Sequence, residues 1–99
     1  MYSILFDLDT TILQDTYGST SWNNAYAEIR RVLEDSGFAW QQGSVYFGNE
    51  KTQAIHCVIA VQKLNTAFPW FATSVRDIRM LRIEEINDLK PVLTGKIQK

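Results

Sequence analysis

The sequence contains very little of the two residue types that most often bind zinc. Cys57 is the single cysteine and His56 the single histidine among 99 residues. One cysteine cannot form an intrachain disulfide, which favours a reducing compartment such as the cytoplasm. Neighbouring Cys57 and His56 cannot supply the four ligands of a structural zinc site. A single histidine also excludes a two-histidine ribonuclease mechanism within one chain, and His56 on a polar helix face is expected to be solvated.

Long hydrophobic runs and an excess of one charge are also missing. No apolar stretch approaches the roughly 18 residues of a membrane span, and no basic start followed by an apolar run indicates a signal peptide. Lys+Arg total 10 and Asp+Glu total 11, so the net charge is −1. This balance excludes a strongly basic nucleic-acid-binding tail and an acidic disordered chain, but it permits a local basic patch. The sequence has neither a glycine-rich phosphate loop nor a G-x-S-x-G nucleophile elbow.

Apolar periodicity predicts the regular elements. Alternating apolar residues indicate strands, and apolar stripes at helical spacing indicate helices. Gly37 suits a helix end, whereas Ser21 and Asn49 suit helix starts. The run Cys57–Val61 alone also fits a buried strand, but the length of the periodic stretch around it favours a helix. The predicted elements are a strand at 2–8, a loop at 10–21, a helix at 22–36, short strands at 38–40 and 44–47, a helix at 49–68 and a strand at 75–83.

The order of these elements predicts an α+β fold. A strand, helix, strand, strand, helix, strand sequence is typical of the ferredoxin-like sandwich, in which two helices cover one face of an antiparallel sheet. The last strand then lies beside the first. A chain of this length forms one core but not a two-lobed enzyme. We expect one domain over residues 1–90 and a tail over 91–99, with a short strand near Val92-Leu93.

Two features indicate a second subunit. The predicted strand at 75–83 is apolar on both faces, so it needs cover on the side away from the helices, and a homodimer partner would fit. Trp70 and Phe71 fall in a connection. Such residues could stack on bases, but more often they are buried against a neighbouring element or a second subunit. Of these, we expect the subunit interface.

The most distinctive local motif is Asp7-Leu8-Asp9-Thr10-Thr11, directly after the first strand. This D-x-D-x-T pattern resembles the first motif of haloacid-dehalogenase-type phosphatases, in which the first aspartate is the nucleophile. That fold needs a large parallel sheet, a later lysine and a paired acidic motif, and this short chain lacks the alternation of strands and helices. The phosphatase interpretation is therefore disfavoured.

Asp7 is a candidate functional residue on physical grounds. Alternation places Asp7 and Asp9 on one face with Ser3 and Leu5, where an acid is costly unless it is paired or functional. The alternative is an ordinary polar strand end, and for Asp9 the two interpretations are equally good. Arg76, Asp77 and Arg79 lie at the start of the last strand, which borders the first. Asp77 or Arg79 can therefore lie near Asp7, within one subunit or across a dimer axis.

Carboxylates beside guanidinium groups suit phosphodiester chemistry. The acid can act as a base or hold a divalent ion, and the arginine can neutralise the charge of the transition state. An ordinary surface Arg–Asp pair explains the same residues equally well. Ser44 follows Gly43 in the turn between the middle strands, where it could donate to a phosphate or simply form the turn.

The whole chain resembles the virulence-associated protein D (VapD) family. Two distinctive segments carry the resemblance, together with Phe6-Asp7-Leu8-Asp9 and the apolar positions of the first helix. They are Trp40-Gln41-Gln42-Gly43-Ser44-Val45-Tyr46-Phe47-Gly48-Asn49-Glu50 and Val75-Arg76-Asp77-Ile78-Arg79-Met80-Leu81-Arg82-Ile83-Glu84-Glu85. The likeness covers roughly residues 1–90. This family is similar to the small CRISPR-associated ferredoxin-fold nucleases.

The resemblance implies a ferredoxin-like homodimer with endoribonuclease activity, which in some members is the toxin of a bacterial toxin–antitoxin pair. The catalytic acid at the end of the first strand corresponds to Asp7. The family's G-S after the second strand corresponds to Gly43-Ser44, and its R-D corresponds to Arg76-Asp77. Asp9 occupies a position that varies in the family.

We therefore predict an endoribonuclease with Asp7, Ser44 and Asp77 as catalytic residues. Arg76, Arg79 and Asp9 are predicted to bind the substrate. Two mechanisms remain open, since Asp7 could bind a divalent ion such as Mg²⁺ that activates water, or the RNA 2′-hydroxyl could attack without metal. The expected partners are RNA, a second copy of the chain and a small antitoxin protein, in the cytoplasm. The alternative is a dimeric binding module that cleaves nothing, because fold alone does not determine function.

Overall fold

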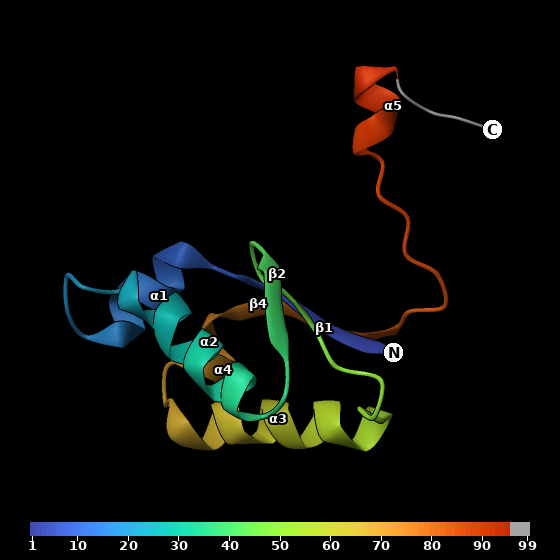
Figure 1. Ribbon diagram of the computed structural model, residues 1–99. Coiled ribbons are helices and arrows are strands. Elements are labelled where there is room, and N and C mark those ends of the chain that lie inside the picture. Colours follow the sequence, from blue (N-terminus) through green and yellow to red (C-terminus); the bar gives the residue numbers. More distant parts are fainter. Residues whose placement is uncertain (96–99) are drawn as a thin grey trace.

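Figure 1 shows the computed structural model of the chain, in which residues 1–95 are described. Strands and helices form a small α+β body, and a C-terminal segment extends away from it. The elements are β1 (Tyr2–Leu8), α1 (Thr10–Tyr17), α2 (Asn24–Asp35), β2 (Ala39–Gln42), β3 (Val45–Phe47), α3 (Ala54–Ala67), α4 (Phe71–Ser74), β4 (Val75–Arg82) and α5 (Lys90–Thr94).

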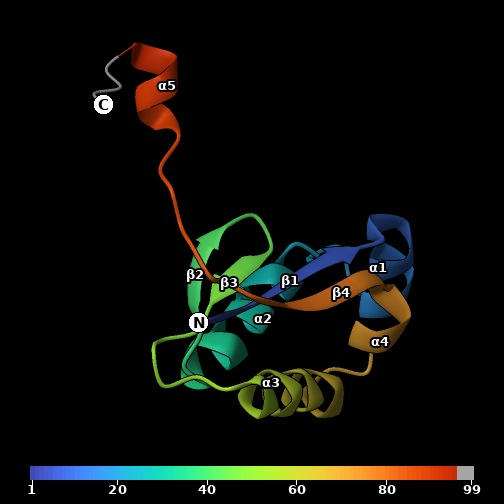
Figure 2. The same cartoon turned by 90° about the vertical axis from the view of Figure 1, so that its right-hand side faces the viewer.

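The sheet has four antiparallel strands in the order β2-β3-β1-β4. This is the order predicted for a ferredoxin-like sandwich, with the last strand beside the first. The register pairs Ile4 with both Tyr46 and Met80, which places β1 in the centre. Helices α2 and α3 lie on one side of the sheet (Figure 2). The predicted α+β architecture is confirmed.

The core lies between this helix-covered face and the two helices. Alternate residues of β1, namely Ile4, Phe6 and Leu8, are 1%, 7% and 5% exposed. They pack with residues that recur at helical spacing on the inner sides of α2 and α3, such as Ile29 and Leu64. Each fully buried aliphatic side chain contributes about 1.5–3 kcal/mol, so this cluster is the main source of stability.

The predicted loop at 10–21 is wrong for residues 10–17, which form helix α1. The Asp9 carboxylate caps its N-terminus, and Gly18 ends it in the left-handed conformation with φ 83°. Only glycine adopts that conformation without a steric penalty. Leu13 is the one buried residue of α1. The hydrophobic pattern was therefore too weak to indicate a helix, although the signals at both ends were present.

Helix α3 begins later than predicted. Asn49 does not cap the helix, because its side chain accepts a hydrogen bond from the Lys51 amide in a preceding turn, at 2.8 Å. The helix starts at Ala54 with Gln53 as its cap. His56 Nδ1 accepts from the Gln53 amide at 2.9 Å, so the single histidine closes a capping box instead of being merely solvated.

The predicted interface position of Trp70 and Phe71 is also wrong. The two residues are 8% and 3% exposed within one chain. Trp70 stacks on Phe68 with ring centroids 4.7 Å apart, and Phe71 meets the edge of Phe6 at 6.4 Å. These aromatic rings close the core at the end of the sheet where α1 and α4 meet. They need no second subunit to be buried.

The segment after β4 leaves the body as an extended arm, here defined as residues 84–95 (Figure 1). Every residue of the arm is exposed, including Ile86, Leu89 and Leu93 at 58%, 69% and 86%. The predicted short strand near Val92-Leu93 is wrong, because those residues lie in helix α5, which ends at Gly95 with φ 68°. Residues 96–99 of the predicted tail lie outside the described residues.

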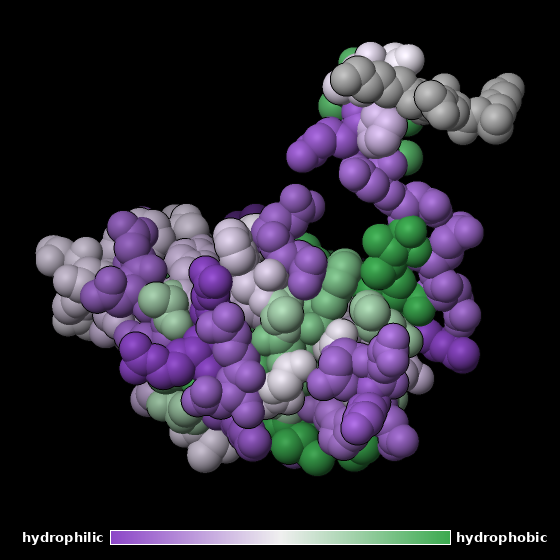
Figure 3. Space-filling model, viewed as in Figure 1, coloured by the Kyte–Doolittle hydropathy of each residue, from purple (hydrophilic) through white to green (hydrophobic). Residues whose placement is uncertain are grey.

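The outer surface of α3 is unusually apolar. Its residues Ile55, Val58 and Ile59 are 55%, 46% and 42% exposed. Hydrophobic side chains accordingly gather along the lower edge of Figure 3, where α3 runs, below a mostly hydrophilic surface. Among residues 1–95, none of the helices combines the length and hydrophobicity that crossing a bilayer requires.

Candidate active site at the end of the first strand

Asp7 lies on the face of the sheet opposite the helices. The side chains of β1 alternate, so Ser3, Leu5 and Asp7 point away from the core that contains Ile4 and Phe6. Antiparallel pairing places Asp77 of β4 directly across from Asp7. The register shifts just after this pair, between Asp7 and Leu8. Two carboxylates therefore stand side by side at an irregular end of the sheet.

Arg76 bridges the two aspartates of the D-x-D motif. Its Nη1 lies 3.6 Å from Asp7 Oδ2, and its Nη2 lies 3.4 Å from Asp9 Oδ2. The side chains of Arg76 and Asp7 are 63% and 61% exposed. Exposed ion pairs contribute little to stability, so folding alone does not explain this arrangement.

Arg79 neutralises the second carboxylate of the pair. Its Nε donates to both Asp77 oxygens, at 3.2 and 3.0 Å. Like charges directly opposite each other on a sheet repel, and the two arginines offset that repulsion. Asp7, Asp9, Arg76, Asp77 and Arg79 are called the Asp–Arg cluster below. It brings three carboxylates and two guanidinium groups together at one exposed position.

Asp9 differs from Asp7 in its local role. The expectation that Asp9 continues the strand face is wrong, because the strand ends at Leu8 and Asp9 caps α1. Its Oδ1 accepts from the Ile12 amide at 3.1 Å, and its own amide donates to the Ser74 carbonyl at 2.7 Å. The Ile12 hydrogen bond, with help from Arg76, lowers the pKa of the Asp9 carboxyl. Asp9 therefore remains ionised and serves poorly as a proton donor.

Ser44 reaches the same end of the sheet through the β2–β3 turn. Gly43 turns the chain with φ 50°, and the Phe6 amide, next to Asp7, donates to the Ser44 carbonyl at 3.2 Å. Ser44 is half-buried and lines a cavity of about 480 Å³ that Tyr26 and other residues share. Burial raises the pKa of the Tyr26 hydroxyl, and the Asp7 charge raises it further. The cavity lies on the helix side of the sheet and the Asp–Arg cluster on the other side, and both lie at the end of β1 that contains Phe6 and Asp7.

Apart from Ser44, the residues around this cavity were not predicted from the sequence. Tyr26 and Arg30 follow the apolar and charged pattern of an ordinary helix, and Trp40 lies in a short strand. The sequence signal that could have indicated this cavity was a tryptophan beside the polar residues Gln41 and Gln42. The structure shows that all residues of this strand are exposed.

A metal site is not complete within one chain. Among residues 1–95 there is no group of three or more His, Cys, Asp or Glu side chains that could hold a metal ion. Arg76 occupies the space between Asp7 and Asp9. A divalent ion at Asp7 would therefore need ligands from a second copy of the chain or from RNA phosphates. Cys57 is buried, and this burial raises the pKa of its thiol.

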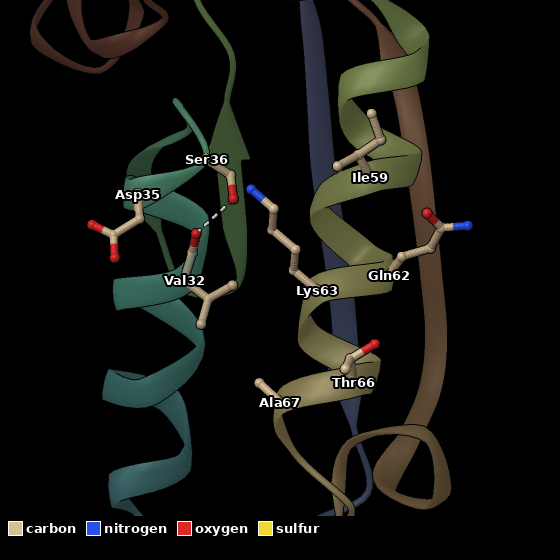
Figure 4. Close-up of a pocket in the computed structure, with 8 residues that line it drawn as sticks. All are labelled: Val32, Asp35, Ser36, Ile59, Gln62, Lys63, Thr66 and Ala67. Atoms are coloured by element: carbon tan, nitrogen blue, oxygen red, sulfur yellow. Dashed lines mark hydrogen bonds between the residues drawn. The ribbon is translucent and has the colours of Figure 1, made fainter.

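A second hollow lies between α2 and α3, away from these residues. Its volume is about 570 Å³, and Figure 4 shows the Lys63 amine and the hydroxyls of Ser36 and Thr66 around it. The Ser36 hydroxyl donates to the Val32 carbonyl at 2.8 Å and so is already satisfied. No member of the Asp–Arg cluster lines this groove. It is a separate surface of the helical layer.

Comparison with known proteins gives consistent similarities over nearly the whole chain. Residues 1–89 match the family described as CRISPR associated protein Cas2. Endoribonuclease VapD 2 of Riemerella anatipestifer is 50% identical over 94 residues, which cover 95% of this chain and 100% of that protein. The Endoribonuclease VapD homolog of Helicobacter pylori (strain ATCC 700392 / 26695) is 48% identical over 93 residues, or 94% of this chain and 96% of that protein. Endoribonuclease VapD of Dichelobacter nodosus is 38% identical over 97 residues, or 96% of this chain and 99% of that protein.

Proposed function

The chain belongs to the CRISPR associated protein Cas2 family and, within it, to the VapD endoribonucleases, and from this premise we propose that it cleaves RNA at the Asp–Arg cluster. An endoribonuclease is a hydrolase of phosphodiester bonds. One observation carries the choice of site: exposed Asp7 lies within 3.6 Å of Arg76 and opposite the Asp77–Arg79 pair. Anion-binding groups and a proton acceptor are thus adjacent and reachable by a polymer substrate.

Asp7 is the proposed general base. It takes the proton of the attacking hydroxyl, which belongs either to water or to the RNA 2′ position. Arg76 and Arg79 stabilise the negative charge that develops on the phosphate, and the Ser44 hydroxyl donates to a phosphate oxygen. Asp77 assists by orienting Arg79 through the two hydrogen bonds to its Nε.

Asp9 supports substrate binding indirectly in this scheme. One of its oxygens caps α1, and the other contacts Arg76. A carboxylate fixed by a helix end holds the guanidinium in one place, which reduces the entropy lost when the phosphate binds. Asp9 therefore acts as a positioning residue for Arg76.

A homodimer is proposed to complete the site. The helix-free face of the sheet carries half-buried Leu5, Val45 and Phe47, with Leu81 47% exposed beside them. A second copy packed on this face would cover these side chains. A two-fold axis near the strand ends would bring two Asp7 carboxylates together, where both could bind one Mg²⁺ ion.

A toxin of a bacterial toxin–antitoxin pair is the proposed biological role, in the cytoplasm. It is supported by the likeness to the virulence-associated family in segments 40–50 and 75–85. Induced wild-type protein should slow bacterial growth, and Asp7→Ala should not. Co-expression of a small antitoxin protein should restore growth of the wild-type strain. Normal growth with abundant active wild-type enzyme would contradict this role.

The alternative is a dimeric ferredoxin-like module that binds RNA or protein without cleaving. The near-neutral composition favours a protein partner for such a module, because nonspecific RNA binders are usually basic. One measurement separates the two functions. The nuclease loses cleavage when Asp7 alone is changed, whereas the binding module does not cleave RNA.

The test uses end-labelled single-stranded RNA with purified wild type, Asp7→Ala and Asp15→Ala. Asp15 is an exposed aspartate of α1 outside the Asp–Arg cluster, so its variant is the matched control. Wild type and Asp15→Ala should cleave, and Asp7→Ala should be folded, dimeric and inactive. Cleavage that survives in Asp7→Ala indicates a contaminating nuclease. Parallel reactions with EDTA choose the mechanism, since unchanged activity rejects the divalent ion.

A further inference from the structure

We propose that the cavity between α2 and the β2–β3 hairpin binds one nucleobase of the RNA, with Trp40 as its stacking platform. This inference rests on the proposed function and adds a substrate-binding subsite to it. The cavity has a volume of about 480 Å³, within the roughly 300–1,000 Å³ range of small-molecule pockets. Its walls combine aromatic rings from Trp40 and Tyr26 with the polar side chains of Asn23, Arg30 and Ser44.

Trp40 is held in a fixed orientation although it is exposed. Its indole Nε1 donates to the Gly43 carbonyl at 2.9 Å across the hairpin turn. The Arg30 guanidinium lies 4.5 Å from the ring centroid, which is a cation–π contact. Even so, Trp40 remains 43% exposed. An apolar ring that is locked in place but left open to solvent is suited to stacking on a base.

Apart from Ser44, the polar groups of the cavity come from one side of α2 and from Asn23 at its N-terminus. Asn23, Tyr26 and Arg30 are three or four residues apart, so they share one face of the helix. An amide can donate to and accept from a base edge, and a guanidinium can bind a phosphate. Arg30 also contacts Glu34 at 3.6 Å, which holds it near the ring. These groups provide the means to distinguish one base from another.

The position of the cavity relative to Asp7 fits a nucleotide. Ser44 lines the cavity, and its carbonyl is bonded to the amide of Phe6, the residue before Asp7. Strand β3 begins only at Val45, which pairs with Leu5, so β1 extends past the hairpin at Asp7. Phe6 lines the cavity from the helix side of the sheet, whereas Asp7 points to the other face. An RNA strand that passes round this end of β1 can therefore place a phosphate at Asp7 and Arg76 and a base beside Trp40. The Asp7 charge is also felt at the Tyr26 hydroxyl on the cavity wall.

The test measures binding separately from cleavage. Fluorescein-labelled single-stranded RNA of about twelve nucleotides is titrated with full-length Asp7→Asn protein, alone or combined with Trp40→Ala, Trp40→Phe or Ile55→Ala. Ile55 is an exposed apolar residue on α3, outside the cavity, and serves as the matched control. A second RNA of equal length and charge carries abasic sugars. Stacking contributes enough that Trp40→Ala should weaken binding about 10-fold, whereas Trp40→Phe should retain most of the affinity.

The abasic RNA identifies what Trp40 recognises. If the ring stacks on a base, the Trp40→Ala substitution weakens binding of the intact RNA and leaves binding of the abasic RNA unchanged. Equal weakening of both RNAs, or no weakening, overturns the proposal. The proposal is also overturned if Trp40→Ala no longer forms a dimer but each folded chain still binds RNA with unchanged affinity. That result would assign the Trp40 ring to a protein interface.

A second measurement does not depend on the alanine variant folding. Adenosine and uridine 5′-monophosphates are titrated into wild type and Trp40→Phe while tryptophan emission is followed. Quenching that is strong in wild type and largely absent in Trp40→Phe supports the subsite, and equal quenching refutes it. Wild-type RNA cleavage is assayed in parallel. Base-dependent binding without cleavage would contradict only the nuclease function, and cleavage without a Trp40 effect would contradict only the subsite.

Discussion

The two faces of strand β1 belong to one seven-residue segment and yet have different functions. Ile4, Phe6 and Leu8 point to the helices and are almost completely buried. Leu5 and Asp7 point the other way, towards a face that no helix covers. The pleat thus separates residues that stabilise the fold from residues available for chemistry, although they are covalent neighbours. Changes on the covered face should act on stability, and changes on the uncovered face should act on activity and assembly.

The largest effect is expected on the covered face, for Phe6→Ala. Phe6 is 7% exposed and packs against Tyr46 and Phe71, with ring centroids 6.2 and 6.4 Å away. Truncation leaves a cavity and should lower the free energy of unfolding by about 3–5 kcal/mol, measured by urea denaturation. Leu5→Ala, one residue away on the uncovered face, should cost clearly less. Equal costs would contradict the difference between the faces.

The next effect concerns activity without stability. Arg76→Gln removes the guanidinium that contacts Asp7 and Asp9, so cleavage should fall about 100-fold in kcat. Because the Arg76 side chain is 63% exposed in both ion pairs, Tm should hardly change. Arg31→Gln, an exposed arginine of α2, is the control and should retain full activity. A large fall in Tm with Arg76→Gln would assign the ion pairs to folding rather than to catalysis.

A smaller effect is expected on assembly. Leu81→Glu places a charge among the apolar side chains of the uncovered face, and a symmetric interface contains the change twice. The dimer dissociation constant, measured by sedimentation, should rise about 10-fold or more. Ile55→Glu adds the same charge to exposed α3 and should leave the dimer intact. A dimer that is weakened only by Ile55→Glu would place the interface on the helical layer.

The smallest effect is expected at Asp9, where the two faces meet at the end of the strand. Asp9→Ala removes the cap of α1 and should lower Tm by roughly a few degrees, whereas Asp9→Asn keeps a capping side chain and should cost less.

The pKa of the Asp9 carboxyl is lowered in the folded protein, so its ionised form stabilises the fold above about pH 4. That stabilisation is lost as the pH falls further, through the folded-state pKa. The Tm difference between wild type and Asp9→Asn should therefore disappear in strong acid, and a constant difference would show that charge is not involved.

Prediction from the sequence succeeded where hydrophobic periodicity was strong. The strand at 2–8, the first long helix ending at Gly37, and the last strand were predicted within a few residues. Their regular apolar spacing reflects one buried face, and such a face is a local property of the chain. Prediction failed for α1 and α5, which bury at most one residue each. Short helices without an apolar stripe are determined by their caps, which carry little weight in a sequence pattern.

The candidate site was predicted in composition but not in geometry. Asp7, Arg76, Asp77 and Arg79 were singled out together, and the register places them together. The position of Asp9 as a helix cap depends on where the strand ends, which alternation alone did not show. Trp70 and Phe71 were predicted at a subunit interface because they fall in a connection. Only the packing of the core shows that other aromatic residues of the same chain bury them.

The sequence by itself determined the order of the main elements, the buried faces of the first strand and of α2, and the identity of the charged residues beside the first strand. These follow from local periodicity and from a family resemblance that extends over the chain. Only the tertiary structure decided which carboxylate each arginine contacts, which aspartate is a cap, and that Trp40 and Ser44 share a cavity near Asp7. Contacts between residues distant in the chain depend on strand register and helix packing, and a shift of one residue would turn Asp7 from the solvent into the core.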